Sequence, residues 1–380
     1  MFYNFQSEYQ QKNYKQMLSI IGKLSRLFSD NNCPYLPYRI QENVFCKYFQ
    51  AENLSRSDCS VDAKKEKIGI GLKTWIGNND QKVAEFDTLR EILSLLSGIE
   101  LATKVSEFRN ERIRITKNLY ALDEMIYHIV KRIPNAMEIY EHAFEPIDIN
   151  GIKILENRGN NNNVYFNDGN HTYHYSLSKN TLYMIFDQMI LLDNFSVEIL
   201  EDPYSYLMGL SADEATRVVD VKSQDIDKDM KLCLRLYSEN KSRGKFVPEK
   251  SGLNQWNASG RKRDFDELYI PFPAEDRERN KKFFPDRDQP FELILPDGFS
   301  ISAKVCQEDN KAIMSNPNKV LGHWLLRNVF ELKPGTLITY QMLEIFGIDS
   351  VIFTKLEDLK YSIDFAELGT YERFYGTNNE

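Results

Sequence analysis

The stretch SGLNQWNASGRKRDFDELYIPFP, residues 251–273, combines three adjacent cations with a row of amides and an indole. Arg261, Lys262 and Arg263 closely follow the tetrapeptide Asn-Gln-Trp-Asn at 254–257. Basic side chains neutralise phosphates, and amide side chains form hydrogen bonds with base edges, so this mixture suits the reading of a DNA duplex. The closing LYIPFP is typical of a β-strand.

The chain as a whole does not share this basic character. Its 380 residues carry a formal net charge of −8, which speaks against a protein that coats nucleic acid without sequence preference. Between residues 241 and 263, however, seven cations accompany a single anion, Glu249. A local basic site and a solvated linker with a charged face both account for this segment.

Composition is typical of a soluble globular protein of two or three domains, with 42% hydrophobic and 27% charged residues. The five cysteines form no CxxC pair, which fits a reducing compartment and not a disulfide framework or a zinc site. The N-terminus lacks a basic segment followed by an apolar core, and the apolar run at 182–192 is interrupted by Asp187 and Gln188. We therefore expect a cytoplasmic protein without membrane contact.

Hydrophobic spacing predicts the order of elements along the chain. Two helices are expected over 14–28 and 39–54, and a helix over 79–98 is expected to start at Asn79 or Asp80 and to stop at Gly98. Strands are expected over 57–63 and 67–75, joined by a charged KKEK turn, and antiparallel strands are expected over 150–200 with a hairpin turn at NDGN (167–170). A strand over 230–238 is expected to lead into an interdomain linker over 239–252. The C-terminal part is otherwise β-rich, with one helix expected over 321–332.

Carboxylates and a lysine are the main chemical signal in the N-terminal part, because the chain has no HxK pair, GxSxG elbow or Walker loop. The strand period of two places Asp58 and Asp62 on one face of the first predicted strand, and Gly71 and Lys73 on one face of the second. A symmetric turn would separate the acids from the lysine, so their meeting requires a one-residue shift or a bulge. Two carboxylates that bind Mg²⁺ beside a lysine are the minimum for metal-assisted phosphodiester hydrolysis. An ordinary surface hairpin explains the same residues.

This segment resembles the core of PD-(D/E)XK nucleases, which has an acid, a hairpin and then (D/E)-x-K. Gly71 stands where the second acid belongs. Some members carry that acid on the following helix, where Glu85 is expected, and Glu42 on the second N-terminal helix is a further acid. The resemblance implies Asp58, Asp62, Lys73, Glu85 and Glu42 as catalytic residues, with Asp58, Asp62 and Glu85 as Mg²⁺ ligands.

From Ser251 to about Phe365 the chain resembles the C-terminal DNA-recognition domain of NgoFVII-type restriction endonucleases, a β-pseudobarrel related to the DNA-binding domain of plant B-three transcription factors. The resemblance rests on the segments GLNQWNASGRKRDFDELYIPFP, FFPDRDQPFELILPDG, AKVCQEDNKAIMSNPNKVLGHWLL and GIDSV, in this order. Family members commonly join this domain to a metal-independent nuclease with an HxK signature, which this chain lacks. The resemblance therefore supports sequence-specific DNA binding more strongly than a particular cleavage chemistry.

In such domains two loop arms grip the major groove, and by position these are 254–264 and 307–319. Arg261 and Arg263 suit guanine, amides suit adenine, and the lysines suit phosphates. Trp256 is either a core residue or a platform that faces DNA, whereas Trp324 is expected in the core. The residues implied to contact DNA are Asn254, Gln255, Trp256, Asn257, Ser259, Arg261, Lys262, Arg263, Asp264, Gln307, Asn310, Lys311, Ser315, Asn316, Asn318 and Lys319.

Together these observations predict a type II restriction endonuclease of mixed α/β (α+β) class. Residues 1–240 are expected to form a PD-(D/E)XK-like mixed-sheet nuclease that uses Mg²⁺, residues 241–365 a DNA-recognition pseudobarrel, and residues 366–380 a tail. Cutting both strands of a duplex needs two active centres, so we expect a homodimer, with a cognate DNA methyltransferase as its partner in the same system. Two alternatives stay open: a DNA-binding protein whose N-terminal part only dimerises, and a nuclease that depends on modified DNA.

Overall fold

The computed structural model describes the chain except residues 55–59, 157–162, 214–229, 255–263 and 377–380. It divides into two compact units. The N-terminal unit comprises Met1–Ser55, Ser60–Asn110 and Leu122–Val221, and the C-terminal unit includes Glu111–Ala121 and Lys222–Glu380. The long helix α4 (Gly98–Leu119) contributes its first part to one unit and its last turns to the other.

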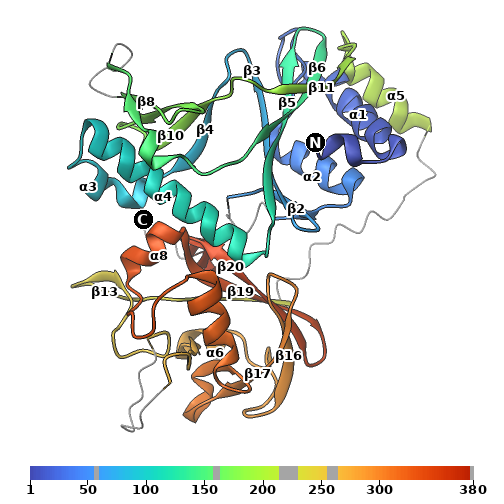
Figure 1. The fold of residues 1–380 in the computed structure, drawn as a ribbon. Coiled ribbons are helices and arrows are strands. Elements are labelled where there is room, and N and C mark those ends of the chain that lie inside the picture. Colours follow the sequence, from blue (N-terminus) through green and yellow to red (C-terminus); the bar gives the residue numbers. More distant parts are fainter. Residues whose placement is uncertain (55–59, 157–162, 214–229, 255–263, 377–380) are drawn as a thin grey trace. The chain divides into compact units, whose positions relative to one another are not determined.

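The N-terminal unit is built on a mixed six-stranded sheet with the order β1-β2-β3-β5-β6-β11 (Figure 1). Neighbouring strands are antiparallel except β3 and β5, which run parallel because β4, α3 (Arg90–Leu93) and α4 intervene between them in the chain. The bounds are β1 (Glu52–Asn53), β2 (Ala63–Lys65), β3 (Ile68–Ile76), β5 (Glu124–Ile133), β6 (Ala136–Ala143) and β11 (Ile190–Ser196).

Two helices cover one face of this sheet. Helix α1 (Glu8–Lys23) starts at Ser7 with a capping box to Gln10, and α2 (Tyr38–Phe49) follows Pro37. Their apolar side chains, among them Phe45 and Phe49, pack with residues of β3 and β5 in one core. The two N-terminal helices predicted from periodicity are therefore present, although α1 begins earlier than expected.

A second, five-stranded antiparallel sheet has the order β4-β10-β9-β8-β7. The NDGN turn joins β8 to β9 as predicted. Residues 79–98, in contrast, do not form one helix: they contain β4, which pairs with β10, and then the short helix α3. The bounds are β4 (Asp80–Glu85), β7 (Lys153–Ile154), β8 (Asn163–Asn167), β9 (Thr172–Ser176) and β10 (Thr181–Ile185), and helix α5 (Pro203–Asp213) follows β11.

The C-terminal unit is a seven-stranded sheet, order β12-β19-β20-β16-β17-β18-β15, that curls into a nearly closed barrel (Figure 1). All pairs are antiparallel except β16 and β20. Phe284 lies in its core, with its ring 5.4 Å from that of Phe291 and 5.1 Å from that of Phe353. The strand bounds are β12 (Lys231–Arg235), β15 (Ile270–Pro271), β16 (Pro290–Ile294), β17 (Ser300–Cys306), β18 (Ala312–Ser315), β19 (Ile348–Glu357) and β20 (Lys360–Glu367).

Helices fill the remaining parts of this unit. The helix predicted over 321–332 is present as α7 (Val320–Gly322) and the π-helix η8 (His323–Val329). It carries Trp324, which is buried and donates a 2.6 Å hydrogen bond to Asp297. The other helices are α6 (Ala274–Arg279), α8 (Tyr340–Phe346) and α9 (Thr370–Tyr375), and α9 packs Tyr371 into the unit within the stretch expected to be a tail.

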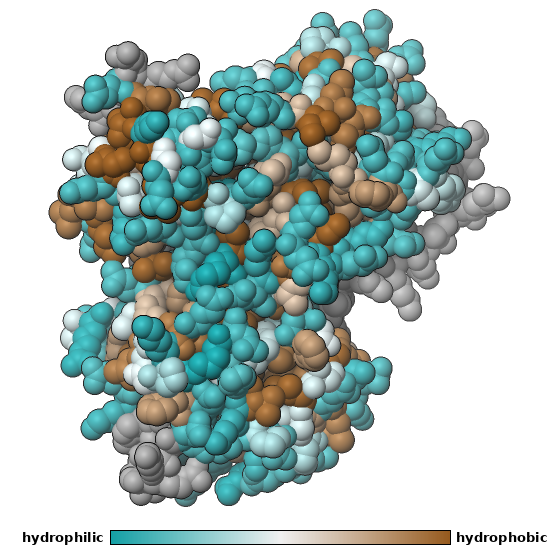
Figure 2. Space-filling view, in the orientation of Figure 1, coloured by the Kyte–Doolittle hydropathy of each residue, from teal (hydrophilic) through white to brown (hydrophobic). Residues whose placement is uncertain are grey.

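The predicted linker 239–252 is also partly ordered into a hairpin of β13 (Ser238–Asn240) and β14 (Gly244–Phe246). Lys245 fixes this hairpin, because its ammonium lies 2.6 Å from Glu372 of α9 and 4.5 Å from the ring centre of Tyr237. Within the described residues, no helix has the length and apolar character needed to cross a membrane. The face shown in Figure 2 is mostly hydrophilic, with hydrophobic side chains scattered over it.

Candidate active site and nucleic-acid interface

Asp62 lies directly before β2 and is held against β3 by hydrogen bonds from both sides. Its carboxylate accepts a 2.6 Å bond from the amide of Leu72, and its own amide donates to the carbonyl of Ile70. Because Ile70 is the register partner of Ala63, the strand is shifted by one residue at Asp62. Strand β2 starts at Ala63, directly after Asp62, and Asp58 lies outside the described residues.

Lys73, on β3, is a partly buried cation. Among the described residues its ammonium forms no ion pair and no hydrogen bond. Burial lowers the pKa of Lys73, the charges of Asp62 and Glu42 oppose this shift, and those of Lys82 and Arg109 add to it. The lysine therefore shares its surroundings with two acids and two further cations.

Helix α2 brings Glu42 to this place. Gln41 donates a 3.0 Å hydrogen bond to the carbonyl of Lys73, so the helix is fixed to β3 at the lysine itself. The next residue, Glu42, is buried. Burial raises the pKa of the Cys46 thiol to about 12, and the charges of Glu42 and Asp62 contribute to the rise. Both acids therefore act on the same region between α2 and the hairpin.

Glu85 is placed differently from the prediction. It ends strand β4 instead of lying on a helix, and its carboxylate is 2.7 Å from the ammonium of Lys82. Lys82, not Glu85, is the residue of this strand whose charge acts on Lys73. Within the described part of the chain, no three His, Cys, Asp or Glu side chains are grouped so as to hold a metal ion. The charges of Asp62 and Glu42 thus act on Lys73, whereas Glu85 pairs with Lys82.

The position of the missing second acid is closed by an aromatic ring. A Cβ atom added to Gly71 would lie 2.9 Å from the ring of Tyr127 on the parallel strand β5. Tyr127 stacks on Phe144 with ring centres 4.1 Å apart. An acidic side chain therefore has no room at 71 unless Tyr127 moves.

Arg109, on α4, is a residue of this site that the sequence did not reveal. It is buried, and it donates hydrogen bonds of 2.8 Å to the carbonyl of Glu145 and of 3.4 Å to the hydroxyl of Tyr127. Its Nε has no hydrogen-bond partner among the residues that the structure describes. No ion pair neutralises it within the described chain. In the sequence, the position of this arginine on the buried side of an amphipathic helix was the signal that could have identified it.

Most of the first predicted DNA-binding arm lies outside the described residues, namely Gln255, Trp256, Asn257, Ser259, Arg261, Lys262 and Arg263. Its two ends are described. Asn254 is buried, and its side chain forms two hydrogen bonds with the backbone of Ile338. Its Oδ1 accepts a 2.7 Å bond from the Ile338 amide, and its Nδ2 donates a 3.0 Å bond to the Ile338 carbonyl. Asn254 is therefore a scaffold residue, and a base contact is not expected of it. Asp264 at the other end is partly exposed, with 41% of its side chain accessible.

The second arm leaves β17 through a turn of unusual backbone geometry. Gln307, Asp309 and Asn310 have positive φ angles of 68°, 56° and 58°, which non-glycine residues seldom adopt. Gln307, Asn310, Lys311 and Asn316 are exposed. Ser315 is buried, and its hydroxyl accepts from the amide of Leu321 at 2.9 Å, so it holds the start of α7 and is not available to DNA.

An acidic segment, Asp264–Glu267, binds the end of this second arm. Lys319 reaches Asp264 at 2.5 Å, and Asn318 donates to Glu267. Asp266 pairs with Arg327 at 2.8 Å and with His323 at 3.0 Å. The hydrogen bond from Lys319 lowers the pKa of Asp264. The two predicted arms are thus joined by the ion pair of Asp264 and Lys319, and Glu267, which lies just beyond the first arm, binds Asn318 of the second.

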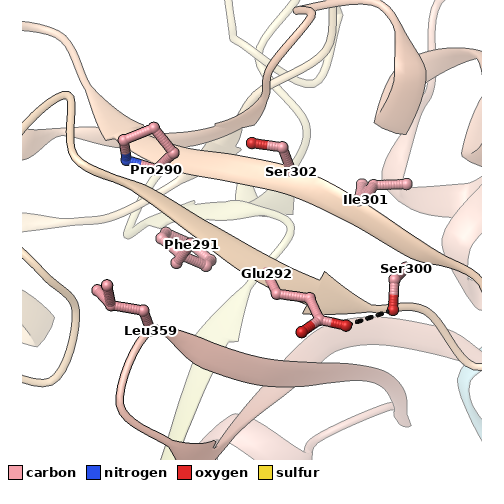
Figure 3. Close-up of a pocket in the computed structure, with 7 residues that line it drawn as sticks. All are labelled: Pro290, Phe291, Glu292, Ser300, Ile301, Ser302 and Leu359. Atoms are coloured by element: carbon pink, nitrogen blue, oxygen red, sulfur yellow. Dashed lines mark hydrogen bonds between the residues drawn. The ribbon is translucent and has the colours of Figure 1, made fainter.

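An open depression of about 450 Å³ lies on the outer side of β16 and β17 (Figure 3). Glu292 points across its rim and accepts a 2.7 Å hydrogen bond from Ser300, and Lys360 lies 3.5 Å from the same carboxylate. Its remaining lining includes Pro290, Phe291 and Leu359. Among the described residues, none of those predicted to contact DNA lines this depression.

The barrel of the C-terminal unit is similar to a known class of DNA-binding domain. Residues 228–357 match the family model of the NgoFVII C-terminal B3-like DNA-binding domain, which comes from a restriction-enzyme family. The match supports the predicted C-terminal resemblance and covers about a third of the chain. No curated protein matches the chain.

Proposed function

We propose that this protein is a type II restriction endonuclease, in which the C-terminal unit selects a DNA sequence and the N-terminal unit hydrolyses the phosphodiester. The match of residues 228–357 to a restriction-enzyme DNA-binding domain carries the proposal. The grouping of Asp62, Glu42 and Lys73 supports the cleavage half. The mixed sheet, in which a hairpin is followed by a crossover to a parallel strand, is compatible with the PD-(D/E)XK-like fold that we propose for this unit.

The residues around Lys73 fit a Mg²⁺ ion. Magnesium is usually bound in proteins by one or two carboxylates together with water and substrate phosphates, and Asp62 and Glu42 offer two carboxylates in one region. Asp58 and Glu85 stay proposed ligands, although Glu85 would first have to leave Lys82. When bound, Mg²⁺ would neutralise phosphate charge and activate a water molecule.

The protein's own groups would position the reactants. The ammonium of Lys73, which forms no ion pair within the described residues, would bind the scissile phosphate or orient the attacking water. Gln41 keeps β3 in place at this lysine. Glu42 takes the place that an acid at position 71 has in the nuclease motif, since the Tyr127 ring closes that position.

Sequence selection is assigned to residues of the two predicted arms. We propose that Arg261 and Arg263 read guanine, that Gln255, Asn257, Gln307, Asn310 and Asn316 contact bases, and that Lys262, Lys311 and Lys319 bind phosphates. Trp256, Ser259, Asp264 and Asn318 line the same arms. A homodimer would supply the two active centres that a double-strand cut needs, and a cognate methyltransferase would protect the host's own sites.

Digestion of plasmid DNA tests the proposal. The full chain with Mg²⁺ is expected to give discrete fragments, Lys73→Ala is expected to give none, and Lys104→Ala, which removes an exposed lysine of α4 paired with Glu107, serves as the matched control. Discrete fragments from Lys73→Ala at the rate of the unmodified chain would refute the site. Parallel digestion of methylated and unmethylated plasmid tests whether cleavage depends on modified DNA.

A second candidate function is sequence-specific DNA binding without cleavage. It is favoured by the finding that no three potential metal ligands are grouped among the described residues. In that case a labelled duplex is retarded at one sequence while the plasmid stays intact with Mg²⁺. The same two measurements therefore separate both functions.

A further inference from the structure

Both described lysines of the second arm that we assign to DNA phosphates already hold a carboxylate. Lys311 lies 3.1 Å from Asp309, and Lys319 lies 2.5 Å from Asp264. All four side chains are about half exposed or more, from 41% for Asp264 to 68% for Asp309. Each cation thus carries an anion of the protein itself on the surface where DNA is expected.

The rest of the acidic segment is not free to move in this way. Asp266 is 22% exposed and is bound by Arg327, which is 15% exposed and also donates to the carbonyls of Leu332 and Phe265. These contacts anchor the segment to η8. Asp264 lies at its exposed end, so its carboxylate can turn away from Lys319 while Asp266 keeps the backbone in place.

A carboxylate and a phosphodiester present the same kind of ligand to an ammonium group, an anionic oxygen at hydrogen-bond distance. Exposed ion pairs of this type are weak, because water and salt screen them and two long side chains must be ordered. Exchange of the carboxylate for a phosphate therefore costs little, but it is not free. The protein's own acids compete with DNA of any sequence for the two lysines.

We propose that Asp264 and Asp309 are built-in phosphate mimics: they occupy the phosphate-binding positions of Lys319 and Lys311 in the free protein, and they weaken binding to DNA of any sequence. The inference rests on the proposed DNA-binding function and assigns two phosphate positions to the second arm. It also agrees with the lowered pKa of Asp264, whose largest cause is the hydrogen bond from Lys319. The chain carries a net charge of −8. Because the mimics weaken phosphate binding further, the affinity for DNA depends more on the residues that read bases.

Removal of one mimic tests this assignment. Asp264→Asn is suitable because the amide oxygen can still accept the 3.1 Å bond from the amide of Asp266. The matched control is Asp288→Asn, which removes the same charge from an exposed pair with Lys304 in the same unit at 2.9 Å. The probe is a labelled 30-base-pair duplex of arbitrary sequence without Mg²⁺, titrated with each full-length variant between 50 and 200 mM KCl.

We expect Asp264→Asn to bind this duplex on the order of 2- to 5-fold more tightly at 100 mM KCl, and Asp288→Asn to match the unmodified chain. The slope of log K against log salt should become steeper by about 0.9, since one more phosphate is neutralised. In a Lys319→Gln background the gain from Asp264→Asn should disappear, which isolates the pair. Asp309→Asn should act like Asp264→Asn through Lys311.

Two outcomes overturn the inference and differ in their reach. If the unmodified chain binds the duplex but Asp264→Asn gains no more affinity than Asp288→Asn, or keeps its gain without Lys319, the mimicry is wrong and the DNA-binding function stands. If no variant binds any duplex at 50 mM KCl, the proposed function fails together with the inference.

Discussion

The candidate sites of the two units handle positive charge in opposite ways. In the N-terminal unit, Lys73 and Arg109 are partly or fully buried and form no ion pair among the described residues. In the C-terminal unit, Lys304, Lys311 and Lys319 lie closer to the surface, and each has a carboxylate within 3.1 Å. Among the described residues, these cations thus lack an ion pair where burial makes a charge costly, and form one near the surface, where an ion pair adds little stability.

This difference distinguishes a site for chemistry from a site for reversible contact. A buried cation without a partner costs free energy of folding, so its retention indicates a task that needs the charge, such as holding a phosphate during hydrolysis. An exposed pair costs almost nothing to form or to exchange, which suits a surface that must release DNA. Four substitutions, from the largest expected effect to the smallest, test this distinction.

Lys73→Met is the sharpest test, because it removes the unpaired ammonium and keeps the stem of the side chain. Cleavage should fall by about 100-fold or more, while the free energy of unfolding should stay equal or rise, since a desolvated charge is gone. Plasmid digestion and urea unfolding measure the two effects, with Lys104→Met as control. A stability loss with unchanged cleavage would make Lys73 a structural lysine and break the comparison.

Arg109→Met tests whether Arg109, the second buried cation, stabilises the fold in a way that Lys73 does not. Its guanidinium donates to the carbonyl of Glu145 and to Tyr127, so its loss should leave a buried acceptor unpaired and lower the free energy of unfolding by about 1–3 kcal/mol. Urea unfolding of the full chain measures this. A stability equal to that of the unmodified chain would place Arg109 with Lys73, as a cation kept for function alone.

Asn254→Ala examines a residue of the DNA-binding arm that we assign to the scaffold. Loss of its two hydrogen bonds with Ile338 should lower the free energy of unfolding by about 1–3 kcal/mol. The folded fraction should bind DNA with an unchanged slope of log K against log salt. Denaturant unfolding and duplex titration of the same preparation give both values. Weaker binding by a variant of unchanged stability would return Asn254 to the interface.

Asp276→Asn tests the C-terminal unit, which also holds a buried acid. Burial raises the pKa of Asp276, and the hydroxyl of Tyr371 donates to it at 2.7 Å. The folded chain therefore keeps this proton to higher pH than the unfolded chain, so the wild-type carboxyl disfavours folding increasingly as pH rises through that interval. Urea unfolding at pH 4.5 and 7.5 should show a larger advantage for the Asn variant at pH 7.5. Parallel curves would mean that Asp276 is stably ionised.

Local patterns predicted much of this fold, and the failures have a common cause. The helices α1 and α2 and the NDGN hairpin follow from periodicity and turn residues close in sequence. Strand β4 was predicted as a helix because its partner, β10, lies about a hundred residues further along the chain, beyond any local window. The hairpin β13–β14 was predicted as a linker for a similar reason, since Glu372 fixes it from the far end of the unit.

The sites were predictable to the extent that residue type implies chemistry. Asp62 and Lys73 could be proposed because an acid, a hairpin and a lysine form a recognisable order, and α2 lies against β3 at Lys73, where it carries Glu42. Arg109 was missed because its role depends on burial beside Tyr127, which only the packing reveals. Asn254 and Ser315 are of residue types that commonly contact DNA, but both form hydrogen bonds inside the domain, Asn254 with Ile338 and Ser315 with Leu321.

The close fit of Gly71 under Tyr127 has a consequence for the evolution of the proposed nuclease motif. A Glu introduced at 71 alone collides with the ring at 2.9 Å, and a small residue introduced at 127 alone opens a void. Passage between the two forms therefore requires paired exchange at 71 and 127. Homologous sequences should vary at these two columns together, with Gly beside an aromatic residue or an acid beside a small one.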